Sequence, residues 1–347
     1  MKIIIVGNLG YIGPCVTSQF RRSFPDAELI GYDLGYFAHC LSNAAYLPEK
    51  NLDRQIFSDV RTFPEELLDG VDAVVDLAAI SNDPMGKEYE EVTMEVNYRA
   101  AVRLAEMCKR KGVKNFVFAS SCSVYGSEGQ HAKTETDELN PLTAYARSKI
   151  AAERDLEPLA GDGFVVTCFR FATACGFTSR LRLDLVLNDF VASAMVNKRI
   201  DILSDGSPWR PLIHAKDMAR AIEWGILRTK DQGGDFLAAN AGSNVWNYQI
   251  KPLAEAVASA LSGVGVSVNK DAEPDKRSYQ IDFGLFRSLA PDHQPVWTLE
   301  DTIRDLHENL VAMNFNDPNF RTSQFMRLKA LARHREEGRL NRNLEWI

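Results

Sequence analysis

The chain has 347 residues, which is enough to bury a large hydrophobic core and to form two domains or two lobes. Hydrophobic residues make up 45% of it and charged residues 25%, ordinary proportions for a soluble globular protein. The net charge of -7 leaves no basic excess to neutralise phosphates, so the composition argues against a general nucleic-acid-binding protein.

Neither a membrane segment nor an export signal is predicted. No stretch approaches the roughly 20 apolar residues of a membrane span, and the apolar run at residues 1–7 is too short for a signal peptide. The six cysteines show neither CxxC nor Cys/His ligand spacing, so we expect reduced thiols and no metal site. The sequence therefore predicts a cytoplasmic protein without membrane or nucleic-acid partners.

The first predicted strand, at residues 2–6, runs into a glycine-rich turn that opens a helix. Gly7, Gly10 and Gly13 let the backbone turn sharply and approach a pyrophosphate at the helix N-terminus. The spacing is GxxGxxG rather than the general GxGxxG. Asp33 ends the second predicted strand, where a carboxylate binds an adenosine ribose and repels a 2′-phosphate. The pattern thus favours NAD over NADP.

Strands and helices continue to alternate through the first half of the chain. This alternation predicts a parallel, doubly wound sheet, whose ligands bind beyond the carboxyl ends of the strands. Asp59, Ala78 and Ser121 fall at such ends, and one long helix is expected over residues 88–110. The further predicted strands cover residues 28–32, 56–60, 71–77, 113–119 and 163–170.

Tyr145 and Lys149 stand four residues apart in a predicted helix that Pro141 would begin. Residues at this spacing lie on one helix face. An ammonium beside a phenol favours the phenolate, which makes Tyr145 a candidate general base near neutral pH. The same spacing occurs by chance in many helices, where the tyrosine packs and the lysine reaches solvent. The catalytic interpretation of this pair therefore depends on the other motifs of the chain.

After residue 170 the pattern changes to a smaller α/β lobe, with a helix ending near Val196 and a helix starting near Asp217. Short strands are expected at residues 200–203 and 264–268, and helices near 246–261 and 299–313. From residue 321 the chain is polar and basic with a helical period, which indicates a solvated or subunit-packing helix rather than a nucleic-acid arm.

Together these motifs resemble the extended short-chain dehydrogenase/reductase family, specifically its nucleotide-sugar epimerases and dehydratases, over about residues 1–315. The resemblance implies an α/β fold: a Rossmann-type doubly wound parallel sheet (residues 1–170, binding NAD), a smaller C-terminal α/β substrate lobe (171–315, binding the nucleotide sugar) and a helical polar tail (316–347). It rests on Gly7, Gly10, Gly13, Asp33, Asp59, Val60, Asn97, Ser121, Cys122, Ser123, Val124, Tyr125, Gly126, Tyr145, Lys149, Arg170, Arg210, His214 and Asp217.

The resemblance also assigns roles by position. Tyr145 would be the base, Lys149 would touch the nicotinamide ribose, and Ser121 would hydrogen-bond the reacting sugar hydroxyl. The implied cofactor residues are Gly7, Gly10, Tyr11, Ile12, Gly13, Asp33, Asp59, Val60, Leu77, Ala78, Ala79, Asn97, Tyr145 and Lys149. The implied substrate residues are Ser121, Ser123, Thr173, Arg180, Arg182, Asn188, Arg210 and Arg277. Guanidinium groups suit diphosphate oxygens, although Arg180 and Arg182 fit a solvated surface equally well.

The implied reaction, in carbohydrate biosynthesis, has no net redox change. A sugar hydroxyl, usually at C4, is oxidised by hydride transfer to tightly bound NAD, and the hydride returns to the opposite face. Dehydratases and decarboxylases of the family carry a glutamate where this chain has Ser123, so elimination lacks its acid/base carboxylate. Thr173 and Cys175 replace residues common in the 4-epimerases, which leaves the sugar open.

Other interpretations remain. A 4-keto-sugar reductase of this family would mostly prefer NADPH, which Asp33 opposes, and a non-catalytic NAD sensor would usually lack the tyrosine or the lysine. Cys122 would be either an extra acid/base or, as we favour, a packed thiol, and we expect His214 to be structural. The family commonly forms homodimers through the helices at residues 88–110 and 142–158.

Overall fold

Continuous apolar runs in the early strands require a sheet that is covered on both faces. The computed structural model describes residues 1–81, 83–126, 131–269 and 278–347, and it contains a seven-stranded sheet in the order β10-β6-β5-β4-β1-β2-β3, parallel throughout. The predicted Rossmann-type doubly wound sheet is confirmed. Its strands are β1 (Lys2–Val6), β2 (Glu28–Asp33), β3 (Arg54–Phe57), β4 (Ala73–Asp76), β5 (Asn115–Ser121), β6 (Val165–Phe171) and β10 (Phe236–Ala241).

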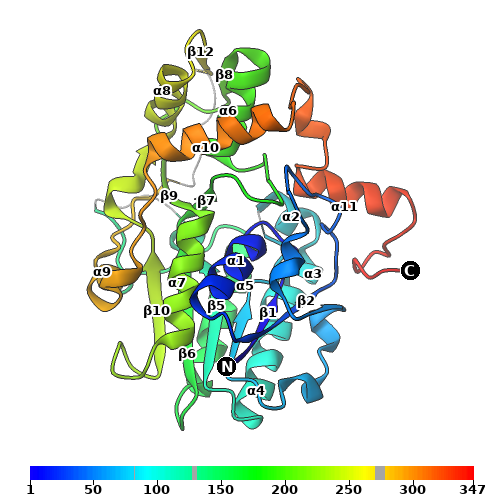
Figure 1. Ribbon diagram of the computed structural model, residues 1–347. Coiled ribbons are helices and arrows are strands. Elements are labelled where there is room, and N and C mark those ends of the chain that lie inside the picture. The colour runs from blue at the N-terminus through cyan, green and yellow to red at the C-terminus, as the bar shows by residue number, and fades with distance from the viewer. Residues whose placement is uncertain (82, 127–130, 270–277) are drawn as a thin grey trace.

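Helices cover both faces of this sheet (Figure 1). Because side chains of a strand alternate between faces, Ile3 and Ile5 join the core on one side while Ile4 and Val6 join the core on the other. The first side packs against α1 (Gly13–Ser23) and α7 (Ala215–Leu227), and the second against α4 (Ala101–Arg110) and α5 (Ala144–Leu156). The carboxyl ends of the strands stay uncovered by these two layers, which leaves room for a ligand there.

The expected long helix at residues 88–110 is confirmed from Glu90 to Arg110, but its expected start at residue 88 is wrong. The helix is continuous through α3 (Glu90–Met94), a π-helical turn (Glu95–Ala100) and α4, and the separate α2 (Asp83–Glu88) precedes it. The π-helical turn contains Asn97, whose buried side chain bonds to the backbone of Ile80. The expected helix start at Pro141 is also wrong, because the Thr143 hydroxyl caps α5 by accepting from Ala146 N at 3.2 Å.

A second lobe stands over the carboxyl end of the large sheet and has its own core (Figure 1). It contains a three-stranded sheet, β11-β9-β7, and a two-stranded sheet, β12-β8. The chain passes from the second lobe back to the first, since α7 packs on the large sheet and β10 is one of its strands. The elements of this half are β7 (Thr173–Cys175), α6 (Val186–Asn197), β8 (Arg199–Ile202), β9 (Trp209–His214), β11 (Asn247–Gln249), α8 (Ile250–Ala260), β12 (Gly265–Val268), α9 (Gly284–Leu289) and α10 (Leu299–Ala312).

The C-terminal tail contains α11 (Arg327–Glu336) and then a short return to the chain end. Figure 1 shows this segment on the side of α2 and α3, opposite α9. Its apolar residues Leu331, Leu340 and Leu344 are buried in a small cluster with Ile80 and Met85. None of the helices in the described parts of the chain is long and apolar enough to cross a membrane.

Candidate active site

A cleft of about 1060 Å³ lies at the carboxyl ends of β1, β2, β4 and β5, between the large sheet and the second lobe. Ligands of doubly wound sheets bind at this position. The cleft wall combines residues from the glycine-rich turn, the strand ends, α5, the second lobe and the C-terminal tail.

The glycine-rich turn has the geometry of a phosphate loop. Gly7 has φ +82°, and a Cβ added there would lie 2.6 Å from Ala78 N. A Cβ at Gly13 would lie 1.9 Å from Asn8 O, so only glycine lets the first turn of α1 approach the backbone of Asn8 this closely. Asp33 accepts hydrogen bonds from Leu9 N at 2.9 Å and Gly35 N at 2.7 Å, which fix its carboxylate at the end of β2. Burial raises the pKa of Asp33, and these backbone N–H groups oppose that shift.

Most of the predicted cofactor residues line this cleft. They are Gly7, Gly10, Tyr11, Ile12, Asp33, Asp59, Val60, Leu77, Ala78, Ala79, Tyr145 and Lys149.

Gly13 and Asn97 do not line it. Gly13 begins α1 behind the loop, and Asn97 is fully buried, bonding to Ile80 N at 2.8 Å, Ile80 O at 3.1 Å and Ser148 Oγ at 3.1 Å. Asn97 therefore positions the loop after β4, which is a correction to its expected contact with the cofactor.

Tyr145, Lys149 and Ser121 meet in the cleft, as the sequence predicts. Ser121, at the end of β5, faces the same cleft as Tyr145, and its nearby hydroxyl acts to lower the pKa of the Tyr145 phenol. Lys149 Nζ lies 5.8 Å from the centre of the Tyr145 ring and 4.4 Å from the centre of the Phe118 ring. The three groups thus converge on the place where a reacting hydroxyl would bind.

The charge state of this group differs from the expectation. Burial raises the pKa of Tyr145 to about 12, against the lowering effects of the nearby Ser121 hydroxyl and the Arg182 charge. Burial lowers the pKa of Lys149 to about 8, against the raising effect of Asp76. Lys149 alone therefore does not make Tyr145 a base near neutral pH, because desolvation of the phenol outweighs nearby charge when no ligand is bound.

Residues 122 and 123 have different environments. Ser123 lines the cleft, and its buried Oγ has no hydrogen-bond partner among the described residues, which suits a polar ligand. The Cys122 thiol is 1% exposed and donates to Arg170 O at 3.0 Å. Burial holds the pKa of this thiol well above its ordinary value, so Cys122 is a packed thiol and lies outside the cleft wall.

Three of the expected substrate residues in the second lobe line the cleft: Thr173, Arg182 and Arg210. Arg182 pairs with Asp184 at 2.9 Å and donates to Ser81 Oγ at 3.0 Å. The Arg210 guanidinium lies 5.9 Å from the centre of the Tyr279 ring. The expected contact from Arg277 lies outside the described residues.

Arg180 and Asn188 are not on the cleft wall, contrary to expectation. Arg180 points to Glu49, with a 2.7 Å ion pair, because the loop that carries it packs under the residues after β2. Asn188 is fully buried and binds Gly176 N at 2.9 Å and Arg182 O at 2.8 Å, so it shapes the loop that presents Arg182.

His214 is structural, as expected. Its Nδ1 accepts from Lys216 N at 3.0 Å at the start of α7, and its ring stacks on Trp297 with centroids 4.1 Å apart. Cys175 is also buried and donates to Ile213 O at 3.4 Å.

Sequence patterns missed several residues of the cleft wall. Ser81 and Asp83 follow β4 in a segment without a motif, and Asp83 accepts from the Thr143 hydroxyl at 2.7 Å. The tail contributes three more, which its polar helical period does not indicate: Arg321, Met326 and Arg327.

Comparisons with known proteins show the family of the chain. The profile of the NAD dependent epimerase/dehydratase family matches residues 3–242. An uncharacterized UDP-glucose epimerase, YtcB, of Bacillus subtilis (strain 168) is 29% identical over 64% of this chain and 71% of its own length. A dTDP-glucose 4,6-dehydratase of Streptomyces griseus is 27% identical over 81% of this chain and 85% of its own.

The fold has solved counterparts. A UDP-glucuronic acid 4-epimerase from Bacillus cereus, solved with UDP-glucuronic acid and NAD, superposes with a TM-score of 0.74 at 21% identity. The superposition covers 90% of this chain and 100% of that one.

Proposed function

Because this chain belongs to the NAD dependent epimerase/dehydratase family and its cofactor is NAD, we propose that it is a nucleotide-sugar epimerase that inverts one sugar carbon, at C4, without net oxidation. The substrate class is a nucleoside diphosphate sugar. The relatives named for UDP-glucose and UDP-glucuronic acid support this class, and the sugar itself stays open.

The residues of the cleft have distinct roles in this proposal. Ser121 and Ser123 hold the sugar hydroxyls, Tyr145 removes the proton from the hydroxyl that is oxidised, and Lys149 orients the cofactor ribose. NAD bound in this cleft would supply the hydride acceptor and donor, and its positive charge would favour the phenolate of Tyr145. Arg210 binds the diphosphate, with Arg277 as its predicted partner.

The observation that carries the proposal is that Tyr145, Lys149 and Ser121 converge on one cleft at the edge of the sheet, where Ser121 is followed by a packed thiol and a serine. A hydroxyl pair of this kind moves a proton on and off oxygen. Elimination of water needs a further acid/base group beside the sugar, and neither Cys122 nor Ser123 supplies a carboxylate.

A 4,6-dehydratase is the second candidate. The Streptomyces griseus relative with this activity matches most of the chain, and the Asp83 carboxylate lines the cleft near enough to raise the pKa of Tyr145. Asp83 is engaged by Thr143 at the start of α5, which favours a positioning role for it.

A panel assay separates the two activities. The full chain is incubated with UDP- and dTDP-linked hexoses, uronic acids and N-acetylhexosamines, and products are analysed by NMR and mass spectrometry. We expect one sugar to give a C4 epimer of unchanged mass, without accumulation of reduced cofactor. A product lighter by one water makes the chain a dehydratase, and consumption of added reduced cofactor with a keto sugar makes it a reductase.

The Tyr145→Phe variant tests the assigned base. Losing the hydroxyl should lower turnover by about 100-fold or more, because general acid–base catalysis contributes on that scale. Bound NAD, measured in the protein after acid release, should stay at the wild-type level. Wild-type turnover in this variant would remove Tyr145 from the mechanism.

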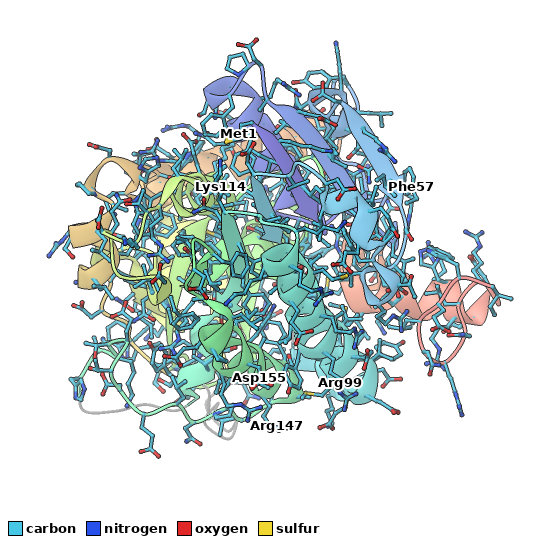
Figure 2. All side chains as sticks on the ribbon, turned by 90° about the horizontal axis from the view of Figure 1, so that it is seen from below. Met1, Phe57, Arg99, Lys114, Arg147 and Asp155 are labelled. Carbon is cyan, nitrogen blue, oxygen red and sulfur yellow. The ribbon has the colours of Figure 1, made fainter. Side chains whose placement is uncertain are left out.

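We also propose that the protein is a homodimer through the surface formed by the helices at residues 88–110 and 142–158. These helices lie side by side on one face of the sheet, and Figure 2 shows Arg99, Arg147 and Asp155 along one edge of the molecule, opposite Met1. Light scattering at several concentrations should give the mass of two chains. A constant mass of one chain, 38.8 kDa, contradicts it.

A further inference from the structure

The C-terminal tail folds back over the end of the sheet that takes the adenosine half of a dinucleotide. In a doubly wound fold the ribose and adenine lie against the loops after β2 and β3, beyond the glycine-rich turn. The family profile ends at residue 242. Two superposed solved structures are matched over 99% and 100% of their own length, but the match covers only 90% of this chain. Figure 1 shows α11 and the chain end beside α2 and α3.

Three hydrogen bonds join residues 34–36, at the start of the loop after β2, to the tail. Trp346 Nε1 donates to Leu34 O at 2.7 Å, and the Tyr36 hydroxyl donates to Leu344 O. The ring of His334 bonds through Nε2 to Tyr36 O at 3.0 Å. These bonds join the last residues of the chain to the segment that directly follows Asp33.

The loops after β3 and β4 are held as well. Arg61, which pairs with the Asp59 carboxylate at 2.5 Å, donates to Asn343 O at 2.8 Å. Leu331, Leu340 and Leu344 are at most 4% exposed and pack with residues of α2 and the loop before it. The tail therefore contacts all three loops that surround the adenosine end of the cleft.

The beginning of the tail forms part of the cleft wall itself. Arg327 lines the cleft but is only 1% exposed, with its guanidinium 4.7 Å from the centre of the Phe37 ring. It donates to Arg180 O at 2.7 Å, and it has no direct ion pair among the residues that the structure describes, although the nearby Asp184 carboxylate acts to raise its pKa. Burial lowers its pKa to about 10, so the side chain stays charged at neutral pH. A buried cation on the cleft wall that forms no direct ion pair suits the negative charge of a dinucleotide.

We propose that the segment from Phe320 to Ile347 is a built-in part of the cofactor site, which closes over the adenosine half of NAD and keeps the cofactor bound through successive turnovers, with Arg327 attracting its negative charge. An enzyme that returns its hydride has no need to exchange NAD, whereas a reductase must exchange it in every cycle. The inference rests on NAD binding rather than on which sugar is converted, so it is tested without substrate.

The test measures how fast bound NAD leaves. The full chain is saturated with NAD, desalted and mixed with a large excess of isotopically labelled NAD, and the bound fraction is analysed by mass spectrometry over time. Leu344→Ser combined with Trp346→Ala loosens the chain end. Arg327→Met keeps the aliphatic stem and removes the charge. We expect both variants to exchange NAD at least about tenfold faster than the wild type.

Arg342→Ala is the matched control, because Arg342 is an exposed cation in the same tail. It should exchange NAD at the wild-type rate. Circular dichroism with saturating NAD checks that each variant is folded. The single variant Trp346→Ala repeats the test without altering the buried Leu344. Trp346 is 39% exposed, so this variant removes a hydrogen bond to the loop after β2 and leaves the buried cluster of the tail in place. Exchange at the wild-type rate in folded Trp346→Ala and Arg327→Met, or rapid exchange in the wild type itself, overturns the proposal.

Discussion

At the residue scale, the reactive pair shows what sequence spacing predicts and what it leaves out. Tyr145 and Lys149 face one cleft because they are one helical turn apart on α5. Their ionisation depends on burial, which comes from elements distant in sequence. The phenol is therefore harder to ionise, and the ammonium easier to deprotonate, than the pair alone predicts.

Asp76 is the carboxylate that acts on Lys149 from inside the sheet. It ends β4, is 2% exposed and is paired across the sheet with Phe118, over whose ring the Lys149 ammonium lies. Burial raises the pKa of Asp76 to about 6, against the lowering effects of Lys149 and of Ala78 N. Asp76 is thus ionised near neutral pH and helps Lys149 keep its proton.

Asp76→Asn should move the alkaline limb of the kcat/KM profile to lower pH, by about one unit or more. The sign follows from the charge: without this carboxylate the pKa of Lys149 falls below about 8, so the ammonium is lost earlier as pH rises. Asp72→Asn, which alters a carboxylate at the opposite end of β4, is the control and should leave the profile unchanged. An unmoved limb in Asp76→Asn would show that Lys149 does not depend on this charge.

At the element scale, α5 is fixed to the sheet by a buried ionic network. Glu153 lies one helical turn beyond Lys149 and pairs with Arg170 of β6 at 2.7 Å, with both side chains at most 7% exposed. Glu153 also accepts from the Ser120 hydroxyl of β5. The network sets the height of Tyr145 and Lys149 above the strand ends.

Glu153→Gln should lower the free energy of unfolding by about 3 kcal/mol, because it leaves the Arg170 charge buried without a counter-ion. Urea unfolding followed by circular dichroism measures this. Glu65→Gln breaks an exposed pair with Arg110 and should stay close to the wild type. If both variants lose similar stability, the buried network does not anchor α5.

Elements with a strong local signal were predictable, and elements that depend on tertiary contacts were not. The apolar runs of β1, β2 and β4 are apparent in the sequence. The seventh strand, β10 (Phe236–Ala241), contains three alanines and has little strand signal of its own, so only its pairing with β6 defines it. The π-helical turn inside the 90–110 helix likewise has no local signal, and its Asn97 bonds to the loop after β4.

At the scale of the whole molecule, the substrate side of the site was the least predictable part. Arg180 and Arg182 are two residues apart and equally basic, yet one pairs with Glu49 beside the first lobe while the other lines the cleft. Arg327 joins the same wall from the far end of the chain. Local sequence does not predict which of these arginines lines the cleft, because that depends on how loops distant in the sequence pack together.

The most direct test of the account follows the hydride. The converted nucleotide sugar is prepared with deuterium at C4 and incubated with the full chain, and the epimer is analysed by NMR and mass spectrometry. We predict that the deuterium stays at C4 of the epimer, because the hydride returns to the carbon it left. An epimer that has exchanged this deuterium for solvent hydrogen would contradict the return of the same hydride.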